Sequence, residues 1–361
     1  MRPKAWPAWI PSVDRCLLVA VVTLHVVAVV RPLDVLAPVD AGHLGRLLLH
    51  GKLPYKDFRF EYPPFAILAF VFPGLAPAGL AKSALALEEL LVEVAVVLLV
   101  LRHHEGAIRR YGLLSLLVFP FLAGGFDAFA MAAITLSTAW LVDERAAGWW
   151  MAGAGALVKL SPAVAWVWCR RRGRAAVAAL AATSAVGLLP ALWYGTSDRT
   201  YLGYTLHRGV QVESLPASIT WLVHLVDGAR SHYAYRFKSW EIAGAGATAG
   251  IVLVLAAAGL VVLAVRAKGA DPWVAALATV LLVLCASKVL SPQYLAWGAP
   301  LAALVSGRLY YGYLALTAIT LLAYSVGGGA TALLAFSAVR NLGLVGLTLM
   351  AVRAAAQPGR S

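Results

Sequence analysis

The chain has 361 residues, of which 61% are hydrophobic and 13% charged, and its mean hydropathy is +0.79. Soluble domains carry about 25% charged residues, so this composition excludes an ordinary soluble domain; apolar runs long enough for roughly 20-residue spans recur from end to end. The formal net charge of +13 comes from Lys and Arg clustered between those runs, and it forms no nucleic-acid-binding motif. We therefore predict an all-α polytopic membrane protein whose partner is the lipid bilayer and not nucleic acid.

The N-terminal part of the chain is expected to begin with a span at 16–31, and the basic residues before it place the N-terminus in the cytoplasm. Residues 33–62 follow as the first external loop. Residues 63–101 then make a net single crossing, with a short re-entrant piece before a full helix at 82–101. Further spans are expected at 111–124, 127–142, 174–193, 241–265, 272–289, 293–306, 309–325 and 330–352, with a helical hairpin at 148–169 and a large external loop at 194–240.

These elements form a single integral membrane domain over residues 1–361, with ten to twelve membrane helices and both termini in the cytoplasm. The segments richest in polar side chains all fall on the external face of this topology. They are the 33–62 loop, Asp127, the hairpin tip at Lys159, the 194–240 loop and "SKVLSPQYL" at 287–295. This convergence predicts a functional site on the external face.

Two aspartates lie at the expected ends of helices. Asp40 precedes leucines spaced by three and four, which predict an amphipathic helix at 40–50 lying in the membrane interface. Asp40 is then either a plain helix N-cap or a general base at the membrane surface. Asp127 follows two glycines, which allow close approach of backbone or substrate, and it is either an ordinary helix-end acid or a site residue.

The stretch "LPYKDFRFEYPPF" at 53–65 places charged side chains among aromatic ones directly before an apolar run. Its two carboxylates, Asp57 and Glu61, have the basic neighbours Lys56 and Arg59. From the residues alone, solvated charges on a loop are the simpler interpretation. The alternative is that Asp57 or Glu61 is a functional carboxylate in place of Asp40.

Two lysines, Lys159 in "VKLSP" and Lys288 in "SKVLSP", each precede a Ser-Pro pair near an apolar segment. A charge within the bilayer costs about 2.5–3.5 kcal/mol on insertion scales, and such charges usually face a cavity. Lysine binds phosphate as a compact point charge, so the pair suggests a phosphate site. Snorkelling of each lysine to the membrane interface is the alternative.

The segment "YTLHRGVQVESLPASITWLV" at 204–223 is the other dense polar cluster. It contains His207, Arg208, Gln211 and Glu213 ahead of a helix that Pro216 can open. Arginine there could hold phosphate in a bidentate manner, and an ordinary polar loop is the alternative.

The ordered set "GKLPYKDFRFEYPP", "GGFDAF", "VKLSP", "LHRGVQVESL", "SKVLSPQYLAW" and "AVRNLGL", together with Asp40, resembles the membrane-embedded type C glycosyltransferases. The likeness is to glycosyltransferase family 87, the polyprenyl-phosphate-mannose and arabinofuranose transferases, and especially to its actinobacterial members. It extends from about residue 38 to 342. The resemblance implies that Asp40 is the catalytic base, although the usual Asp-x-x-Tyr reads "DAGH" here, with His43 in place of the tyrosine.

The resemblance further implies an inverting transfer of a sugar, with mannose favoured, from a polyprenyl-phosphate donor to a glycolipid or cell-envelope glycan on the external face of the bacterial plasma membrane. The donor phosphate would be bound by Arg208, Lys288, Lys159, Lys56 and Arg59. Sugar and acceptor would contact His43, Tyr55, Asp57, Glu61, Tyr62, Asp127, His207, Gln211, Glu213, Gln293 and Tyr294. No cofactor is expected, because the lipid-linked sugar is a substrate, and no DxD motif for a metal-bound nucleotide sugar occurs in the sequence.

Two other functions are compatible with these residues. A transporter or flippase of a lipid-linked sugar would use the same basic and aromatic side chains without a base. A non-catalytic assembly subunit would tolerate removal of the charges at 53–65. The three cysteines, which are far apart and lie in apolar runs, predict neither a disulfide framework nor a metal site.

Overall fold

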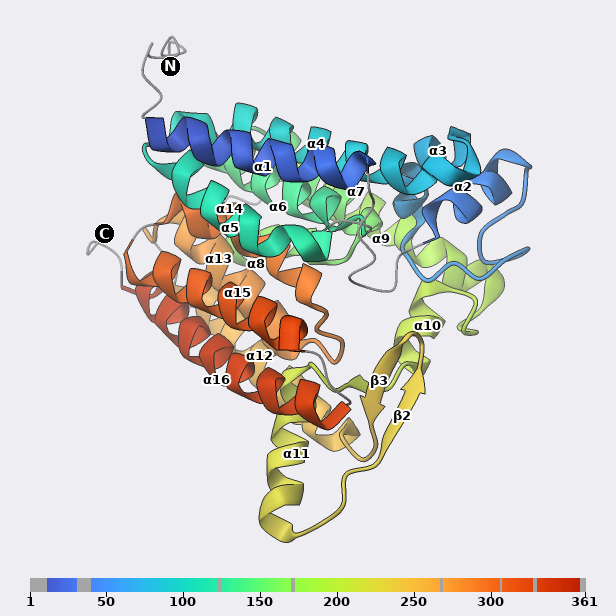
Figure 1. Ribbon diagram of the computed structural model, residues 1–361, viewed down its shortest axis with the longest axis vertical. Coiled ribbons are helices and arrows are strands. Elements are labelled where there is room, and N and C mark those ends of the chain that lie inside the picture. The colour runs from blue at the N-terminus through green and yellow to red at the C-terminus, as the bar shows by residue number, and fades with distance from the viewer. Residues whose placement is uncertain are drawn as a thin grey trace.

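The computed structural model describes residues 12–30, 40–122, 125–169, 173–266, 269–305, 307–326 and 330–357. Within these ranges the chain is a bundle of α-helices with one small sheet at its edge (Figure 1). The α-helices are α1 Ser12–Val30, α2 Ala41–Leu49, α3 Leu68–Leu75, α4 Ala81–Leu99, α5 Ala107–Leu122, α6 Asp127–Val142, α7 Ala147–Val158, α8 Ala165–Trp168, α9 Arg174–Tyr194, α10 Tyr201–His207, α11 Leu215–Asp227, α12 Gly246–Arg266, α13 Pro272–Ala286, α14 Ala299–Leu304, α15 Arg308–Val326 and α16 Ala330–Ala355. Short 3₁₀ helices are η1 Pro64–Ile67, η2 Ala78–Leu80, η3 Leu101–His103, η4 Ser161–Val164 and η5 Pro292–Gly298.

Three of these helices, α9, α12 and α16, are long and apolar enough to cross a membrane by themselves. On α12, for example, Val254 is 68% and Leu255 is 66% exposed, as expected of side chains that face lipid. The predicted all-α polytopic membrane fold is therefore confirmed, whereas the count of ten to twelve membrane helices and the loop boundaries stay predictions. The expected loops include residues 33–39, which lie outside the described part of the chain.

Two of the predicted membrane segments, a hairpin and a span, are built from short helices and not from long continuous ones. The hairpin expected at 148–169 consists of α7, a break at Lys159, then η4 and α8. The span expected at 293–306 is η5 followed by the short α14. In the first, Pro162 lacks an N–H and restricts the preceding residue, so the α-helix ends before it. In the second, Pro292 lies just before the expected span and opens η5. The two Lys-Ser-Pro elements are therefore turns of backbone inside the bundle.

A buried polar cluster connects α1 to α4 and α5. His25 on α1 contacts Glu93 on α4 through Nε2 and a carboxylate oxygen 2.6 Å apart. The other oxygen of Glu93 accepts a hydrogen bond of 2.6 Å from the Tyr111 hydroxyl and one of 3.3 Å from Ser115, both on α5. Buried charges require such partners, and this cluster specifies how three apolar helices pack.

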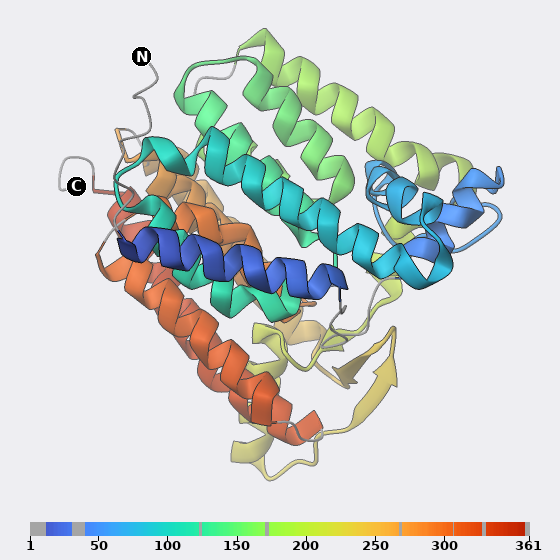
Figure 2. The same cartoon turned by 45° about the horizontal axis from the view of Figure 1, so that its top comes forward.

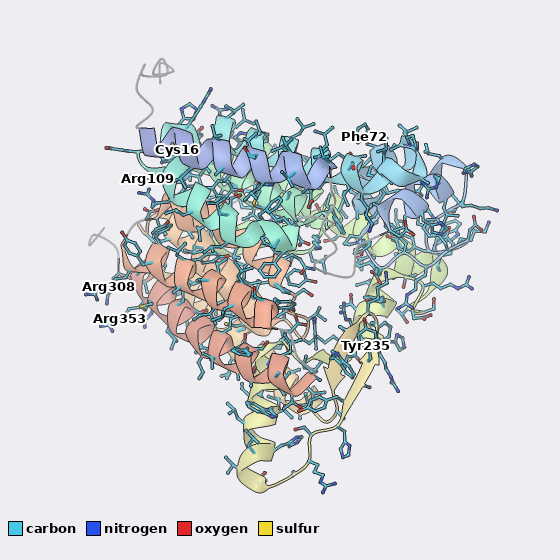
Figure 3. The ribbon with its side chains drawn as sticks, viewed as in Figure 1. Cys16, Phe72, Arg109, Tyr235, Arg308 and Arg353 are labelled. Carbon is cyan, nitrogen blue, oxygen red and sulfur yellow. The ribbon has the colours of Figure 1, made fainter. Side chains whose placement is uncertain are left out.

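The small sheet has the order β1–β3–β2, with β1 Val210–Gln211, β2 Tyr233–Arg236 and β3 Ser239–Ile242 all antiparallel to their neighbours. It lies with α2 and α10 at one end of the bundle, on the right in Figures 1 and 2. The start of α1 and the end of α16 lie at the opposite end. Arg109, Arg308 and Arg353 are at that opposite end as well, and Tyr235 of the sheet is far from them (Figure 3).

Candidate active site

A cavity of about 910 Å³ lies where the sheet meets the helical bundle. Its lining comes from widely separated parts of the chain: residues 61–63, the start of α6, the break at Lys159 with η4, α10, the sheet, α12, and the turn from α13 to η5. Most of the segments that the sequence marked as polar therefore meet at one place.

One wall of the cavity is apolar and is formed by α12, with Leu253, Ala256 and Leu260. The same helix exposes Val254 and Leu255 on its other side. The helix that forms this wall thus has apolar side chains on both of its sides. A cavity with one such wall and polar groups elsewhere fits an amphiphilic ligand.

An ion pair is buried in the polar wall. Lys159 Nζ donates to Asp127 Oδ1 over 2.5 Å, and Trp297 Nε1 donates to the same oxygen over 2.7 Å. The Lys159 ammonium also lies 4.6 Å from the centre of the Phe126 ring and 5.0 Å from that of Tyr294. Its charge is thus balanced by a carboxylate and enclosed by aromatic rings, an arrangement that supports cation–π attraction.

Besides Lys159 and the exposed Lys238, the cavity lining contains two cations, Arg208 and Lys288, which form its cationic side. Lys288 Nζ donates to the Arg208 carbonyl oxygen over 2.6 Å, and Arg208 Nη2 donates to Ser239 Oγ over 3.1 Å. Arg208 Nε is buried without a hydrogen-bond partner in the described part of the chain. Desolvation lowers the pKa of the Lys288 ammonium. Within the described ranges neither cation forms an ion pair, so this side of the cavity keeps positive charge available for an anion.

Glu61 brings a carboxylate into the cavity from the end of the aromatic stretch. The Tyr62 hydroxyl donates to Glu61 Oε1 over 2.9 Å, and the Tyr204 hydroxyl is a second hydrogen-bond partner. Burial and the Glu61 charge raise the pKa of both hydroxyls well above the usual range, so both remain donors. Arg59 stacks over the Tyr204 ring at 4.7 Å but does not line the cavity.

Glu213 is the third carboxylate of the cavity, and it is buried. Burial raises the pKa of Glu213 to about 7, against the opposing effect of the Arg340 charge. Gln211 Nε2 donates to its carboxylate, and Arg340 Nη2 donates to its backbone oxygen. Asn341 Nδ2 also donates to that backbone oxygen, over 3.1 Å. Two polar residues in the middle of α16 therefore hold the segment that presents Glu213.

Ten of the predicted site residues line the cavity: Glu61, Tyr62, Asp127, Lys159, Arg208, Gln211, Glu213, Lys288, Gln293 and Tyr294. The other predicted residues, Asp40, His43, Tyr55, Lys56, Asp57, Arg59 and His207, do not. Asp40 is exposed and caps α2, where its Oδ1 accepts from the His43 N–H over 3.0 Å. Asp57 accepts from the Leu53 N–H over 2.8 Å within its own turn.

The aromatic residues of 53–65 mainly contact one another. Tyr55 and Phe60 are buried with Phe70 and Phe126 in one cluster, with ring centres 5.3 to 5.9 Å apart in the T-shaped pairs among them. The Tyr55 hydroxyl donates to the Tyr62 carbonyl over 2.6 Å. Only residues 61–63 reach the cavity, so the stretch is chiefly a packed support for its wall.

Sequence reasoning gave no role to Ser161, Trp297, Tyr204 or Arg340. The repetition of "LSPAVAW" and "LSPQYLAW" was a signal for two of them, because Ser161 and Trp297 belong to these segments. Arg340 also carried a signal, since an arginine in the middle of an apolar span needs a buried partner.

A sequence model described as glycosyltransferase family 87 matches residues 60–292, more than half of the chain. The chain belongs to glycosyltransferase family 87. No curated protein and no solved structure matches it. The matched range contains Glu61, Asp127, Lys159, Arg208 and Lys288, and thus most of the cavity described above. The protein is accordingly a membrane glycosyltransferase, with sugar donor and acceptor as its substrates.

Proposed function

We propose that this family 87 enzyme transfers a sugar, with mannose the first to test, from a polyprenyl-phosphate donor to a hydroxyl of a glycolipid or cell-envelope glycan. The observation that carries the proposal is the cavity, which joins an apolar wall on a membrane-spanning helix to the cationic side formed by Arg208 and Lys288. An isoprenoid chain fits the first feature and a phosphate the second.

The proposed reaction is a single inverting displacement. Asp40 takes the proton of the acceptor hydroxyl, whose oxygen bonds to the anomeric carbon. The bond from that carbon to the phosphate oxygen breaks, and polyprenyl phosphate leaves with the electron pair. Arg208 and Lys288 offset the charge that grows on the departing phosphate.

The assignment of Asp40 as base comes from the family resemblance. One oxygen of its carboxylate caps α2, and the other has no hydrogen-bond partner among the described residues. Asp40 begins the helix whose next residue, Ala41, belongs to the same buried cluster as Phe126, a residue of the cavity lining. This supports a position for Asp40 near the cavity.

We place the cavity on the external face of the bacterial plasma membrane, with both termini in the cytoplasm. The support is the arrangement of basic residues near the ends of helices. Arg109, Arg308 and Arg353 lie at the end of the bundle opposite to the sheet (Figure 3), and such residues favour the cytoplasmic side.

The test is a transfer assay with purified protein in nanodiscs. Polyprenyl-phospho-mannose and, separately, the arabinofuranose donor are incubated with a membrane glycolipid extract, and products are identified by mass spectrometry. Transfer from one donor would support the proposal and name the sugar. Translocation of either donor across the bilayer with its glycosidic bond intact, and without product, would instead indicate a flippase.

A further inference from the structure

Four buried polar atoms on residues that line the cavity have no hydrogen-bond partner in the described part of the chain. They are Ser161 Oγ, Gln211 Oε1, Gln293 Oε1 and Arg208 Nε. Ser161 is 5% and Gln211 is 4% exposed. A buried polar atom without a partner is unfavourable, so a group of them around one cavity indicates a ligand that supplies the missing bonds.

The three uncharged atoms come from elements that meet around η5. Ser161 begins η4, two residues after Lys159, whose ammonium lies over the Tyr294 ring. Gln293 precedes Tyr294 in η5. Gln211 Nε2 lies 3.5 Å from Ser291 Oγ, directly before η5. Gln293 thus lies in η5, Gln211 lies beside the start of η5, and Ser161 is two residues from Lys159, which contacts η5.

The orientation of the Gln211 amide follows from its other partner. Its Nε2 donates to a carboxylate oxygen of Glu213, and Oε1 is the amide atom without a hydrogen-bond partner among the described residues. A free amide oxygen accepts hydrogen bonds from hydroxyl groups. The ligand group that meets it is therefore a donor and not an anion.

Lys159 adds no net positive charge to this region, because its ammonium is paired with the Asp127 carboxylate. Tyr294 is stacked on Trp297 with ring centres 4.3 Å apart and an angle of 19°, which gives the region a rigid aromatic surface beside its polar atoms. A sugar carries hydroxyl groups around a ring that has apolar C–H faces. It can therefore match both the polar atoms and the aromatic surface of this region.

We propose that Ser161, Gln211 and Gln293 form a sugar-hydroxyl subsite that is distinct from the cationic side with Arg208 and Lys288. The inference rests on the proposed function and deepens it: the uncharged residues select the sugar of the donor, and the cations bind its phosphate. Ser161, Gln211 and Gln293 are specificity-determining residues, and Lys159 binds neither part of the donor.

The test compares three ligands in nanodiscs by tryptophan fluorescence: polyprenyl-phospho-mannose, polyprenyl phosphate without sugar, and an alkyl mannoside without phosphate. The variants are Ser161→Ala, Gln293→Leu and, as the contrasting change, Arg208→Gln. Each of the first two should weaken the sugar-bearing ligands roughly 3- to 10-fold and leave polyprenyl phosphate unchanged. Arg208→Gln should weaken both phosphate ligands and leave the alkyl mannoside unchanged.

The outcomes separate this inference from the proposed function. Equal losses for polyprenyl phosphate and its mannosyl form in Ser161→Ala and Gln293→Leu, or no loss at all, would overturn the subsite. If wild type binds the alkyl mannoside in a manner sensitive to these two variants, but binds neither phosphate ligand, the subsite holds and the donor class is wrong. If wild type binds none of the three ligands, both proposals are wrong.

Discussion

Lys159 and Asp127 lie 32 residues apart in the sequence and form a 2.5 Å ion pair in the wall of the cavity. Their side chains are only 13% and 2% exposed. The pair removes the charge of Lys159 from the set available to a phosphate. It leaves the half-buried Arg208 and Lys288 and the exposed Lys238 as the lining cations without an ion pair among the described residues.

Removal of one partner of this pair should destabilise the protein strongly. Asp127→Asn leaves the Lys159 ammonium buried without a counter-charge, and breaking a buried pair typically costs about 3–5 kcal/mol. We expect a clear drop in Tm, part of which the double variant with Lys159→Met should restore. Asp198→Asn is the matched control, because its 3.7 Å pair with Arg59 is solvent-exposed and should be worth at most about 1 kcal/mol. An unchanged Tm in Asp127→Asn would contradict the buried pair.

Arg208 and Arg59 provide a matched comparison for phosphate binding. Both guanidinium groups lie over the Tyr204 ring, at 5.5 Å and 4.7 Å, but only Arg208 lines the cavity. Arg208→Gln should weaken donor binding by about 10- to 100-fold, since hydrogen bonds to charged groups contribute about 1.5–3 kcal/mol. Arg59→Gln should have little effect on the measured Kd. A larger loss of donor affinity in Arg59→Gln than in Arg208→Gln would indicate that the phosphate binds at the aromatic stretch 53–65.

Asp40 and Glu61 are two candidate carboxylates for the catalytic base, and variants of each can distinguish them. Asp40→Asn should lower kcat by about 10²–10⁴-fold with donor affinity retained, as expected for loss of a general base. Glu61→Gln, in which the side chain can still accept from Tyr62, should reduce kcat far less. Single-turnover assays on both variants give the answer: a large loss in Glu61→Gln with an active Asp40→Asn would assign the base to Glu61.

The raised pKa of Glu213 has a consequence for stability. Between pH 4.5, its ordinary pKa, and about 7, the folded protein keeps a proton that the unfolded chain has lost. The free energy of unfolding therefore falls as pH rises through this window, by on the order of 1–3 kcal/mol. Thermal unfolding of wild type and Glu213→Gln across this range should show a steeper decline of Tm for wild type. Parallel curves would mean that Glu213 is not protonated in the folded state.

The cluster of His25 and Glu93 should matter for stability and not for the chemistry. Glu93→Ala leaves His25, Tyr111 and Ser115 without their common partner, and we expect a loss of about 3–5 kcal/mol, read as a fall in Tm. Glu88→Gln on the same helix is the control, because Glu88 Oε2 has no hydrogen-bond partner among the residues that the structure describes. Similar Tm values for the two variants would argue against the inference that this cluster stabilises the packing of α1 on α4 and α5.

The amino-acid sequence by itself determined the class of the protein. Hydropathy is a local property, so apolar runs of sufficient length specify membrane helices wherever they occur, and Pro162 specifies a break at the hairpin tip. The ordered motifs also indicated the glycosyltransferase family that the match over 60–292 shows. These features need no knowledge of which helix packs against which.

Only the tertiary structure decided which charged residues share the cavity and which are already paired. Trp297 bonds Asp127 across 170 positions, and Arg340 bonds the Glu213 backbone across 127 positions. The same structure leaves Asp40 as a helix cap outside the cavity lining and buries Tyr55 among aromatic rings. The physical reason is that the partner of a buried polar group is set by the packing of helices distant in sequence, which no local pattern encodes.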